Sequence, residues 1–322
     1  MGWVKECERR MRHFLKARGY RSARSVRNMV EAMWITSEQQ LALQGNTAAR
    51  MVVALPVDAN IQDAEFRCFS QWGEDGILQF LVAKTGVRER TFVEFGVEDY
   101  QQSNTRFLMQ NDGWSGLVID GSPRNVERIR ASPLFPRHTL NPVAAWISRE
   151  NINDLIRGGG LEGPIGLLSV DIDGNDYWVW EAIDVVAPVI VVCEYNNLFG
   201  AHRAVTVPYD AGRVWDGSHA YWGASLRALC LLAESKGYAF VGSNKAGLNA
   251  FFVRKDHLGG LRVGDPVADF RPSTYREGRD PRNPSRFLDR RERLEAIADL
   301  ELVDVERGER GKVRDLLTAE FG

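Results

Sequence analysis

RTFVEFGVEDYQQSNTRFLMQNDGWSGLVIDGS, residues 90–122, is the stretch that decides the fold. Its run Thr91–Phe95 is short, apolar except for one glutamate, and rich in β-branched and aromatic residues, which predicts a buried parallel strand. Gly96 ends that strand, and we expect a helix to open at Ser103–Thr105, whose polar side chains suit a helix start. A second apolar run, Gly116–Ile119, predicts the next strand. The stretch therefore predicts one strand–helix–strand unit of a doubly wound parallel sheet.

Two carboxylates in this unit indicate what it binds. Glu94 lies in the first strand, and Asp120 follows the second strand 26 residues later, where an acidic side chain can accept hydrogen bonds from both hydroxyls of a ribose. Gly96 lets a ligand approach the backbone, but Val97–Tyr100 adds no second glycine to cradle a pyrophosphate. Carboxylates here would repel a dinucleotide and suit the sulfonium and ammonium groups of S-adenosylmethionine. A nicotinamide or flavin cofactor, or a sheet that binds nothing, are the alternatives.

Two further segments are candidates for the same cofactor. FSQWGEDGIL, residues 69–78, leads into a helix, and its Gln71 either lines the methionine end of the cofactor or caps the helix. Leu140–Ala144 predicts the third strand, and in a doubly wound sheet the end of this strand approaches the adenine ring. We therefore expect Ala145 and Trp146 to lie beside the adenine.

Oxygen-bearing side chains follow the next two strands. Ile165–Val170 and Val189–Cys193 predict the fourth and fifth strands, and polar residues come directly after each. These residues are expected to meet at the mouth of the sheet: Asp171, Asp173, Glu194 and Asn196. Oxygen ligands suit a hard cation such as Mg²⁺, which could hold a substrate hydroxyl and lower its pKa. Alternatively, the same groups hydrogen-bond cofactor, substrate and backbone without a metal.

A long segment of irregular sequence follows the fifth strand, at residues 199–221. Its aromatic side chains alternate with Asp, Arg and His, a mixture that suits a sugar, whose ring faces stack and whose hydroxyls need donors and acceptors. His202 is the candidate general base in this loop, and the alternative is a histidine that is simply solvated.

Composition bounds the class of protein. The chain has 322 residues, of which 44% are hydrophobic and 26% charged, and its net charge of −2 gives no attraction to nucleic acid. Four scattered cysteines without a C-x-x-C pair fit a reducing compartment. The longest apolar run, Val185–Cys193, is too short to span a bilayer, and no signal peptide is visible. These observations predict a cytoplasmic protein.

The ends of the chain predict two appendages. Residues 1–45 show apolar stripes at helical spacing, with a break at Gly19 and a third short helix from Ser37 to a stop at Gly45. Nine Lys or Arg residues and two acids lie between Lys5 and Arg27. This basic face is either solvated over a stripe that packs on the domain or a second subunit, or it contacts anionic lipid or a lipid-linked substrate.

Motifs in order along the chain resemble the FkbM-type methyltransferase family. They are FSQWGEDGIL, FVEFGVEDYQQSNT, GLVIDGSP, LSVDIDGNDYWVWEAI, VVCEYN, VPYD, YWGASL and KGYAFVGSNKAGLNAFFV, spread over residues 69–254. The resemblance implies a class I S-adenosylmethionine-dependent O-methyltransferase. The cofactor contacts that it implies are Glu94, Gly96, Asn104, Asp120 and Asp171. Asp173-Gly174 and Glu194 also look like the metal-ligand positions of catechol-type and TylF-type O-methyltransferases, whereas Asn175-Asp176 departs from the FkbM pattern.

The sequence thus predicts an α/β protein with a doubly wound, seven-stranded class I methyltransferase sheet. Its last two strands, Tyr238–Gly242 and Asn249–Arg254, are expected to form an antiparallel hairpin. The expected divisions are a helical extension at 1–65, the methyltransferase domain at 66–256 and an appendage at 257–322, with a loop and then a helix from Arg286. The predicted activity is methylation of a saccharide hydroxyl by a homo-oligomer. The alternatives are methylation of a small natural product and a non-catalytic protein that keeps the fold.

Overall fold

The computed structural model describes residues 23–213, 220–273, 278–280 and 283–321. The chain divides into two compact units, Met1–Thr47 and Ala48–Gly322. Helix α2 (Ala23–Val53) runs without interruption, so the prediction of a separate short helix that stops at Gly45 is wrong. One glycine inside a helix costs only about 1 kcal/mol, and no proline lies within Ala23–Val53 to break the hydrogen bonding. The predicted helix before Gly19 and most of the basic segment lie outside the described residues.

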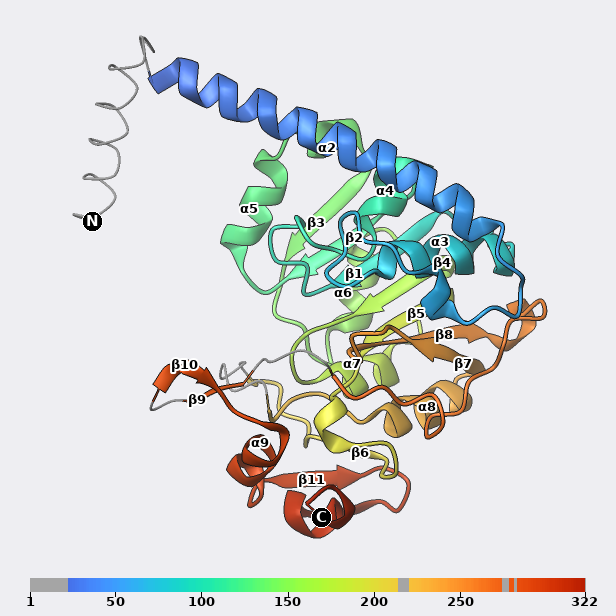
Figure 1. Ribbon diagram of the computed structural model, residues 1–322, viewed down its shortest axis with the longest axis vertical. Helices are drawn as coiled ribbons and strands as arrows, with labels where there is room; N and C mark the ends of the chain where they lie inside the picture. Colours follow the sequence, from blue (N-terminus) through green and yellow to red (C-terminus); the bar gives the residue numbers. More distant parts are fainter. Residues whose placement is uncertain (1–22, 214–219, 274–277, 281–282, 322) are drawn as a thin grey trace. The chain divides into compact units, whose positions relative to one another are not determined.

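The core of the second unit is a seven-stranded sheet (Figure 1). Its strands are β1 (Thr91–Phe95), β2 (Ser115–Asp120), β3 (Leu140–Ala144), β4 (Gly163–Val170), β5 (Val186–Glu194), β7 (Tyr238–Ser243) and β8 (Asn249–Arg254). The strand order is β3-β2-β1-β4-β5-β8-β7. Strand β8 runs antiparallel to β5 and β7, and the other six strands share one direction. This is the order of the class I methyltransferase fold, so the predicted fold class is confirmed.

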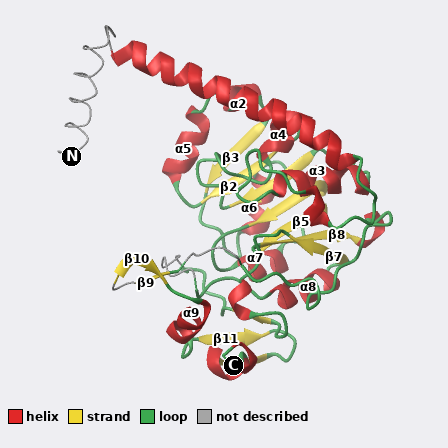
Figure 2. Ribbon diagram, viewed as in Figure 1, coloured by secondary structure: helices red, strands yellow, loops and turns green. Residues whose placement is uncertain are grey.

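Helices cover both faces of this sheet (Figure 2). They are α3 (Glu74–Thr85), α4 (Arg106–Asp112), α5 (Pro123–Ala131), α6 (Ile152–Gly158), α7 (Asp176–Ala182) and α8 (Leu226–Ser235). Alternate residues of one strand enter different cores: Val93 packs in the core that contains α6, α7 and α8, whereas Phe92 packs in the core that contains α3 and α4. Because both faces are buried, the strands are continuous apolar runs, which made them recognisable in the sequence.

Short 3₁₀ helices connect several of these elements. They are η1 (Ile61–Ala64), η2 (Phe135–Arg137), η3 (Asn197–Phe199), η4 (Lys255–His257) and η5 (Thr318–Glu320). None of the helices among the described residues combines the length and the apolarity that crossing a bilayer requires.

The C-terminal residues fold onto the segment that follows β5. Their elements are β9 (Arg279–Asp280), β10 (Asn283–Phe287), α9 (Arg290–Ile297), β11 (Glu301–Asp304), β12 (Glu309–Lys312) and α10 (Val313–Leu316). The predicted helix start at Arg286 is wrong, because the helix begins after Asp289, whose side chain and that of Glu292 form a capping box. A two-residue strand, β6 (Val205–Thr206), pairs with β11, so the segment after β5 is held in a second small sheet.

Candidate functional site

A cavity of about 580 Å³ opens where β1, β4 and β5 end. Its charged lining residues are Arg67, Glu94, Glu98, Asp171, Asp173 and Glu194. Five carboxylates thus face one guanidinium, and the cavity is strongly acidic. Small-molecule sites in proteins typically enclose about 300–1,000 Å³, so this cavity has room for a cofactor.

Seven of the residues predicted from the sequence line this cavity and five do not. The lining residues are Gln71, Glu94, Gly96, Asn104, Asp171, Asp173 and Glu194. The lining does not include Asp120, Ala145, Trp146, Asn196 and His202. The sheet therefore brings together the residues at the ends of β1, β4 and β5, as its parallel order requires.

Glu94 is buried at the centre of the polar contacts at the end of β1. Its Oε1 accepts a hydrogen bond from the Asn104 backbone N–H at 2.8 Å, and its Oε2 accepts from the Ser103 hydroxyl and from the N–H and hydroxyl of Thr105. The pKa of Glu94 is raised, because burial outweighs the hydrogen bonds from Ser103 and Thr105, which lower it. Glu94 therefore fixes the segment that enters α4 while it also lines the cavity.

Gly96 brings β1 and β4 into backbone contact. Its φ is +66°, and a Cβ built at this position would lie 1.8 Å from the carbonyl oxygen of Asp171. The sequence predicted a glycine that admits a ligand, and the structure shows that its close neighbour is the backbone of Asp171, directly after β4. A side chain here would have to push the two strand ends apart.

Asp120 ties the end of β2 to the loop after β1. One oxygen of its carboxylate accepts from the Glu98 N–H at 2.8 Å, and the other accepts from the Ser122 N–H at 2.8 Å and the Asn125 amide at 3.1 Å. Because both oxygens already have donors, the predicted contact with ribose would be added to a structural role. That contact stays a prediction.

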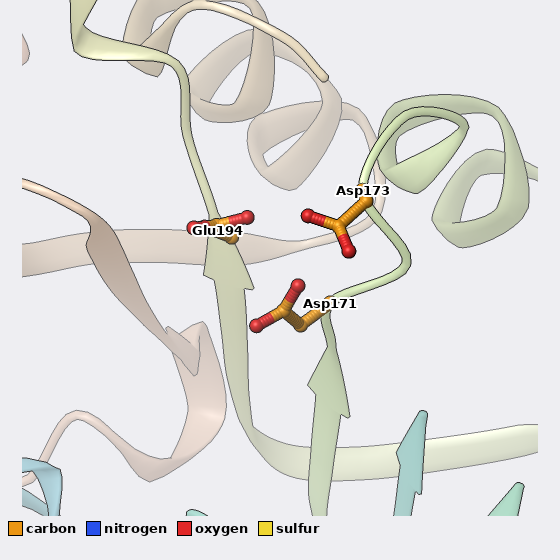
Figure 3. Close-up of side chains that lie close together, drawn as sticks. All are labelled: Asp171, Asp173 and Glu194. Carbon is orange, nitrogen blue, oxygen red and sulfur yellow. The ribbon is translucent and has the colours of Figure 1, made fainter. Parts of the chain in front are cut away.

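Three carboxylates converge beside the ends of β4 and β5 (Figure 3). Oxygen atoms of Asp171, Asp173 and Glu194 all lie within 4.8 Å of one another. The pKa of Asp171 is raised well above its ordinary value by burial and then by the negative charges of Asp173 and Asp176, whereas the hydrogen bond with Glu194 lowers it. A cation bound here would relieve the repulsion among these side chains.

A turn with a left-handed residue carries Asp173 into this carboxylate cluster. Asp173 has a φ of +55°, which few residues other than glycine adopt. The buried Asp176 holds the turn, since its two oxygens accept from the Ile172 N–H at 2.8 Å and from the Gly174 N–H at 2.9 Å. Asp176, one of the two residues at which the sequence departs from the FkbM pattern, therefore shapes the cluster.

Asn196, predicted as a fourth oxygen ligand, is not brought to the carboxylates. Its Oδ1 accepts from the Leu198 N–H at 3.0 Å, and its amide nitrogen donates to the carbonyls of Ala220 and Trp222 at 3.1 and 3.0 Å. The side chain is buried and caps η3. The segment after β5 turns at this point, so of these two residues Glu194 lines the cavity and Asn196 does not.

Asn249 supplies an amide that the sequence analysis missed. It opens β8, is the register partner of Glu194 and lines the cavity. Its amide nitrogen donates to the buried Glu74 at 2.9 Å, and Asn244 donates to the same oxygen at 2.7 Å. Because Glu74 holds the nitrogen, the amide oxygen of Asn249 is the end available to the cavity. Nothing local in the sequence shows that these distant residues meet.

The remaining predicted residues lie around the cavity. Gln71 is exposed and lines it, as does Arg67, which the sequence analysis also missed. Ala145 is half-buried and donates its N–H to the carbonyl of Asp120 at 3.0 Å, and the neighbouring Trp146 is 50% exposed. His202 is exposed and does not line the cavity, and its role as general base stays a prediction.

Comparisons with known proteins give fold-level likeness only. No family model matches the sequence, and a search of curated proteins found no match. An O-methyltransferase from Bacillus cereus in complex with SAH is 13% identical, with 67% of this chain and 89% of that chain covered and a TM-score of 0.38. A putative O-methyltransferase from Klebsiella pneumoniae is 10% identical, with 67% and 96% covered and a TM-score of 0.35. A putative caffeoyl-CoA O-methyltransferase from Staphylococcus aureus is 14% identical, with 56% and 82% covered and a TM-score of 0.34. Likeness at this level says nothing about the activity of this chain.

Proposed function

We propose that this protein is an S-adenosylmethionine-dependent O-methyltransferase. The observation that carries the proposal is the acidic cavity at the carboxyl ends of the central strands, with five carboxylates and one arginine in its lining. Ligands of open α/β sheets bind at this edge. The lining disfavours the pyrophosphate of a dinucleotide, and it suits a cofactor with a sulfonium and an ammonium group. Arg67 is the group that would pair with the carboxylate of the same cofactor.

The residues present fit that cofactor. Burial and then the negative charges of Asp173 and Asp176 raise the pKa of Asp171, so a cation bound at this point would reduce the repulsion among these carboxylates. Glu94 and Asn104 line the same wall and connect β1 to the start of α4. The proposed cofactor contacts are therefore Glu94, Gly96, Asn104 and Asp171, with Gln71 at the rim.

The carboxylates also supply what an acceptor hydroxyl needs. When bound, S-adenosylmethionine supplies an electrophilic methyl group. Asp173 is exposed in the cavity and would accept the proton of the acceptor hydroxyl as the O–CH₃ bond forms and the S–CH₃ bond breaks, with S-adenosylhomocysteine as the leaving group. Glu194 and Asn249 are register partners on β5 and β8, and the Glu194 carboxylate and the Asn249 amide oxygen would orient the hydroxyl.

The same cluster fits Mg²⁺. Asp171, Asp173 and Glu194 would hold the ion, since hard divalent cations prefer carboxylate oxygens. The ion would lower the pKa of the acceptor hydroxyl. It would also balance part of the negative charge of the cavity, which is consistent with the raised pKa of Asp171.

We further propose that the acceptor is a saccharide and that the chain belongs with the FkbM-type enzymes. The ordered motifs of residues 69–254 support the family. Trp178 of α7 and Tyr209 of the segment after β6 pack edge to face, and Arg149 lies over both rings. Aromatic faces among hydrogen-bonding side chains are the surface that sugars bind.

Isothermal titration calorimetry with S-adenosylhomocysteine tests the cofactor assignment. Wild-type protein should bind S-adenosylhomocysteine and not NAD⁺. Asp171→Asn should weaken binding about tenfold, because it removes a charge-assisted hydrogen bond. Asp154→Asn is the matched control, because its side chain is 84% exposed on α6. Absence of binding to the wild-type protein would refute the cofactor assignment.

A panel of sugars tests the acceptor. Each sugar is incubated with S-adenosylmethionine and the protein, and the product is read as a mass gain of one CH₂ group. Methylation of phenolic natural products with no methylation of any sugar would overturn the saccharide assignment and leave the cofactor assignment standing.

A further inference from the structure

A second cavity, of about 450 Å³, lies where β10 leads into α9. Three arginines line it: Arg286, Arg290 and Arg293. The cavity borders the acidic one through the segment after β5. Asn197 lines the arginine cavity, and Glu194, three residues earlier, lines the acidic cavity, so their Cα atoms are at most about 11 Å apart.

A second contact joins the walls of the two cavities. The amide nitrogen of Asn197 donates to the carbonyl of Gly247 at 3.2 Å, and Leu248, the next residue, lines the acidic cavity. The two cavities therefore share a wall, which the segment after β5 and residues 247–248 form.

The two carboxylates that line the arginine cavity are held by the helix start. Asp289 accepts from the Glu292 N–H at 2.8 Å, and Glu292 accepts from the Asp289 N–H at 3.0 Å and pairs with Arg286. Their remaining capacity to repel an anion is reduced, because each is already hydrogen-bonded.

The arginines are held in place but retain donors. Arg286 uses one nitrogen for Asp280, at 3.1 Å, and another for Glu292. Arg290 donates to Glu320 and to the carbonyl of Leu198, the latter at 3.2 Å. A guanidinium has five N–H donors, so each can bind a further oxyanion while its present contacts keep it oriented.

We infer that the acceptor of the proposed methyl transfer carries an oxyanion, a phosphate or carboxylate group, that binds Arg286 and Arg290 while its hydroxyl lies at the carboxylate cluster. This inference rests on the proposed function. The opposite charges of the two cavities orient such an acceptor, since the five carboxylates of the first repel its anionic end. A neutral sugar lacks this orientation.

Saturation-transfer NMR with three probes tests the inference: glucose, glucose 1-phosphate and glucuronate. The anionic probes should bind the wild-type protein and glucose should not. Binding of both anions identifies any oxyanion as the ligand group, whereas binding of one identifies it as phosphate or as carboxylate. The double variant Arg286→Gln/Arg290→Gln should bind about tenfold more weakly. Arg291→Gln is the matched control, because Arg291 lies on the same helix with its side chain 76% exposed and pairs with Glu295.

Equal binding of glucose and the anions, or unchanged binding by the double variant, would overturn the inference. Should the double variant unfold, Arg286→Gln alone is measured, since its side chain is 50% exposed. S-adenosylhomocysteine affinity is measured on the same samples. Cofactor binding without anion binding overturns this inference alone, whereas loss of cofactor binding by the wild-type protein overturns the proposed function.

Discussion

Gly96→Ala should destabilise the protein because a methyl group has no room between the ends of β1 and β4. Two costs add. An L-residue at a φ of +66° costs about 1–2 kcal/mol. A Cβ at 1.8 Å from the Asp171 carbonyl forces two backbones apart, and overpacking of this kind costs about 1–3 kcal/mol more. The free energy of unfolding should therefore fall by about 2–5 kcal/mol, a large share of the total for a typical domain.

Gly86→Ala separates the two costs. Gly86 ends α3 with a φ of +63°, and nothing lies within 4 Å of a Cβ built there. This control carries the backbone strain without the clash, so it should cost about 1–2 kcal/mol. Urea unfolding followed by tryptophan fluorescence gives both free energies. The reasoning is refuted if Gly96→Ala costs no more than Gly86→Ala.

The clash should also displace the Asp171 carboxylate from its place in the cluster, because the backbone of Asp171 has to move away from the added methyl group. Gly96→Ala should therefore weaken S-adenosylhomocysteine binding in calorimetry at temperatures where the variant is still folded, and Gly86→Ala should not. Normal affinity in a destabilised Gly96→Ala would show that the contact between β1 and β4 supports the fold without positioning the carboxylates.

Three more predictions concern the surroundings of the cavity. Asn249→Ala should raise the KM for the acceptor about tenfold and leave S-adenosylhomocysteine affinity unchanged, and a change confined to cofactor affinity would contradict its assignment to the acceptor. EDTA should remove methyl transfer and Mg²⁺ should restore it, and full activity after chelation would exclude the metal. Burial raises the pKa of Asp75 above its ordinary value of 3.8, so its contribution to wild-type stability is present below pH 3.8 and is lost as the pH rises through the raised pKa. Asp75→Asn should therefore gain stability relative to wild type as the pH rises through this window in urea titrations, and a constant difference would refute the assignment.

Much of the sheet was predictable, and burial on both faces explains why. Thr91–Phe95, Leu140–Ala144 and Asn249–Arg254 were predicted with the bounds that the structure shows. The inner strands Thr91–Phe95 and Asn249–Arg254 are buried on both faces, so a short apolar run marks them without any need for alternation. The edge strand Leu140–Ala144 has two exposed residues, and its bounds do not have this explanation. The meeting of Asp171 and Glu194 also followed from the sequence, because neighbouring parallel strands present their carboxyl ends at one edge.

The contacts that depend on distant partners were not predictable. Asn249 is brought to the cavity by the antiparallel insertion of β8, and its orientation depends on Glu74, 175 residues earlier. The small sheet of β12, β11 and β6 was not predicted, because β6 has only two residues and forms its hydrogen bonds with the distant β11. The helix after β10 was placed four residues early because the arginine-rich sequence near Arg286 resembles a helix surface, whereas the capping box fixes the start.

The structure divides the acidic residues of the rim into two kinds. In Asp75, Asp120 and Asp176, the carboxylates accept hydrogen bonds from backbone N–H groups and hold the loops around the strand ends. Glu94 has this role and also lines the cavity. The sequence cannot separate these from residues that bind a ligand, because both kinds follow a buried strand or precede a helix.

Asp171 differs from these structural carboxylates because carboxylate groups, and not only hydrogen-bond donors, surround its side chain. Burial raises the pKa of Asp171 most, as it does for Asp75 and Asp176, but here the negative charges of Asp173 and Asp176 raise it further. Hydrogen-bond donors from the backbone make a buried carboxylate tolerable in the fold, whereas carboxylate neighbours make it costly until a cation arrives. Fold stability alone does not account for this electrostatic repulsion, which the binding of a cation would offset. The acidity of the rim therefore indicates function at the carboxylate cluster of Asp171, Asp173 and Glu194, and the assignment of a positively charged ligand depends on this cluster more than on the carboxylates around it.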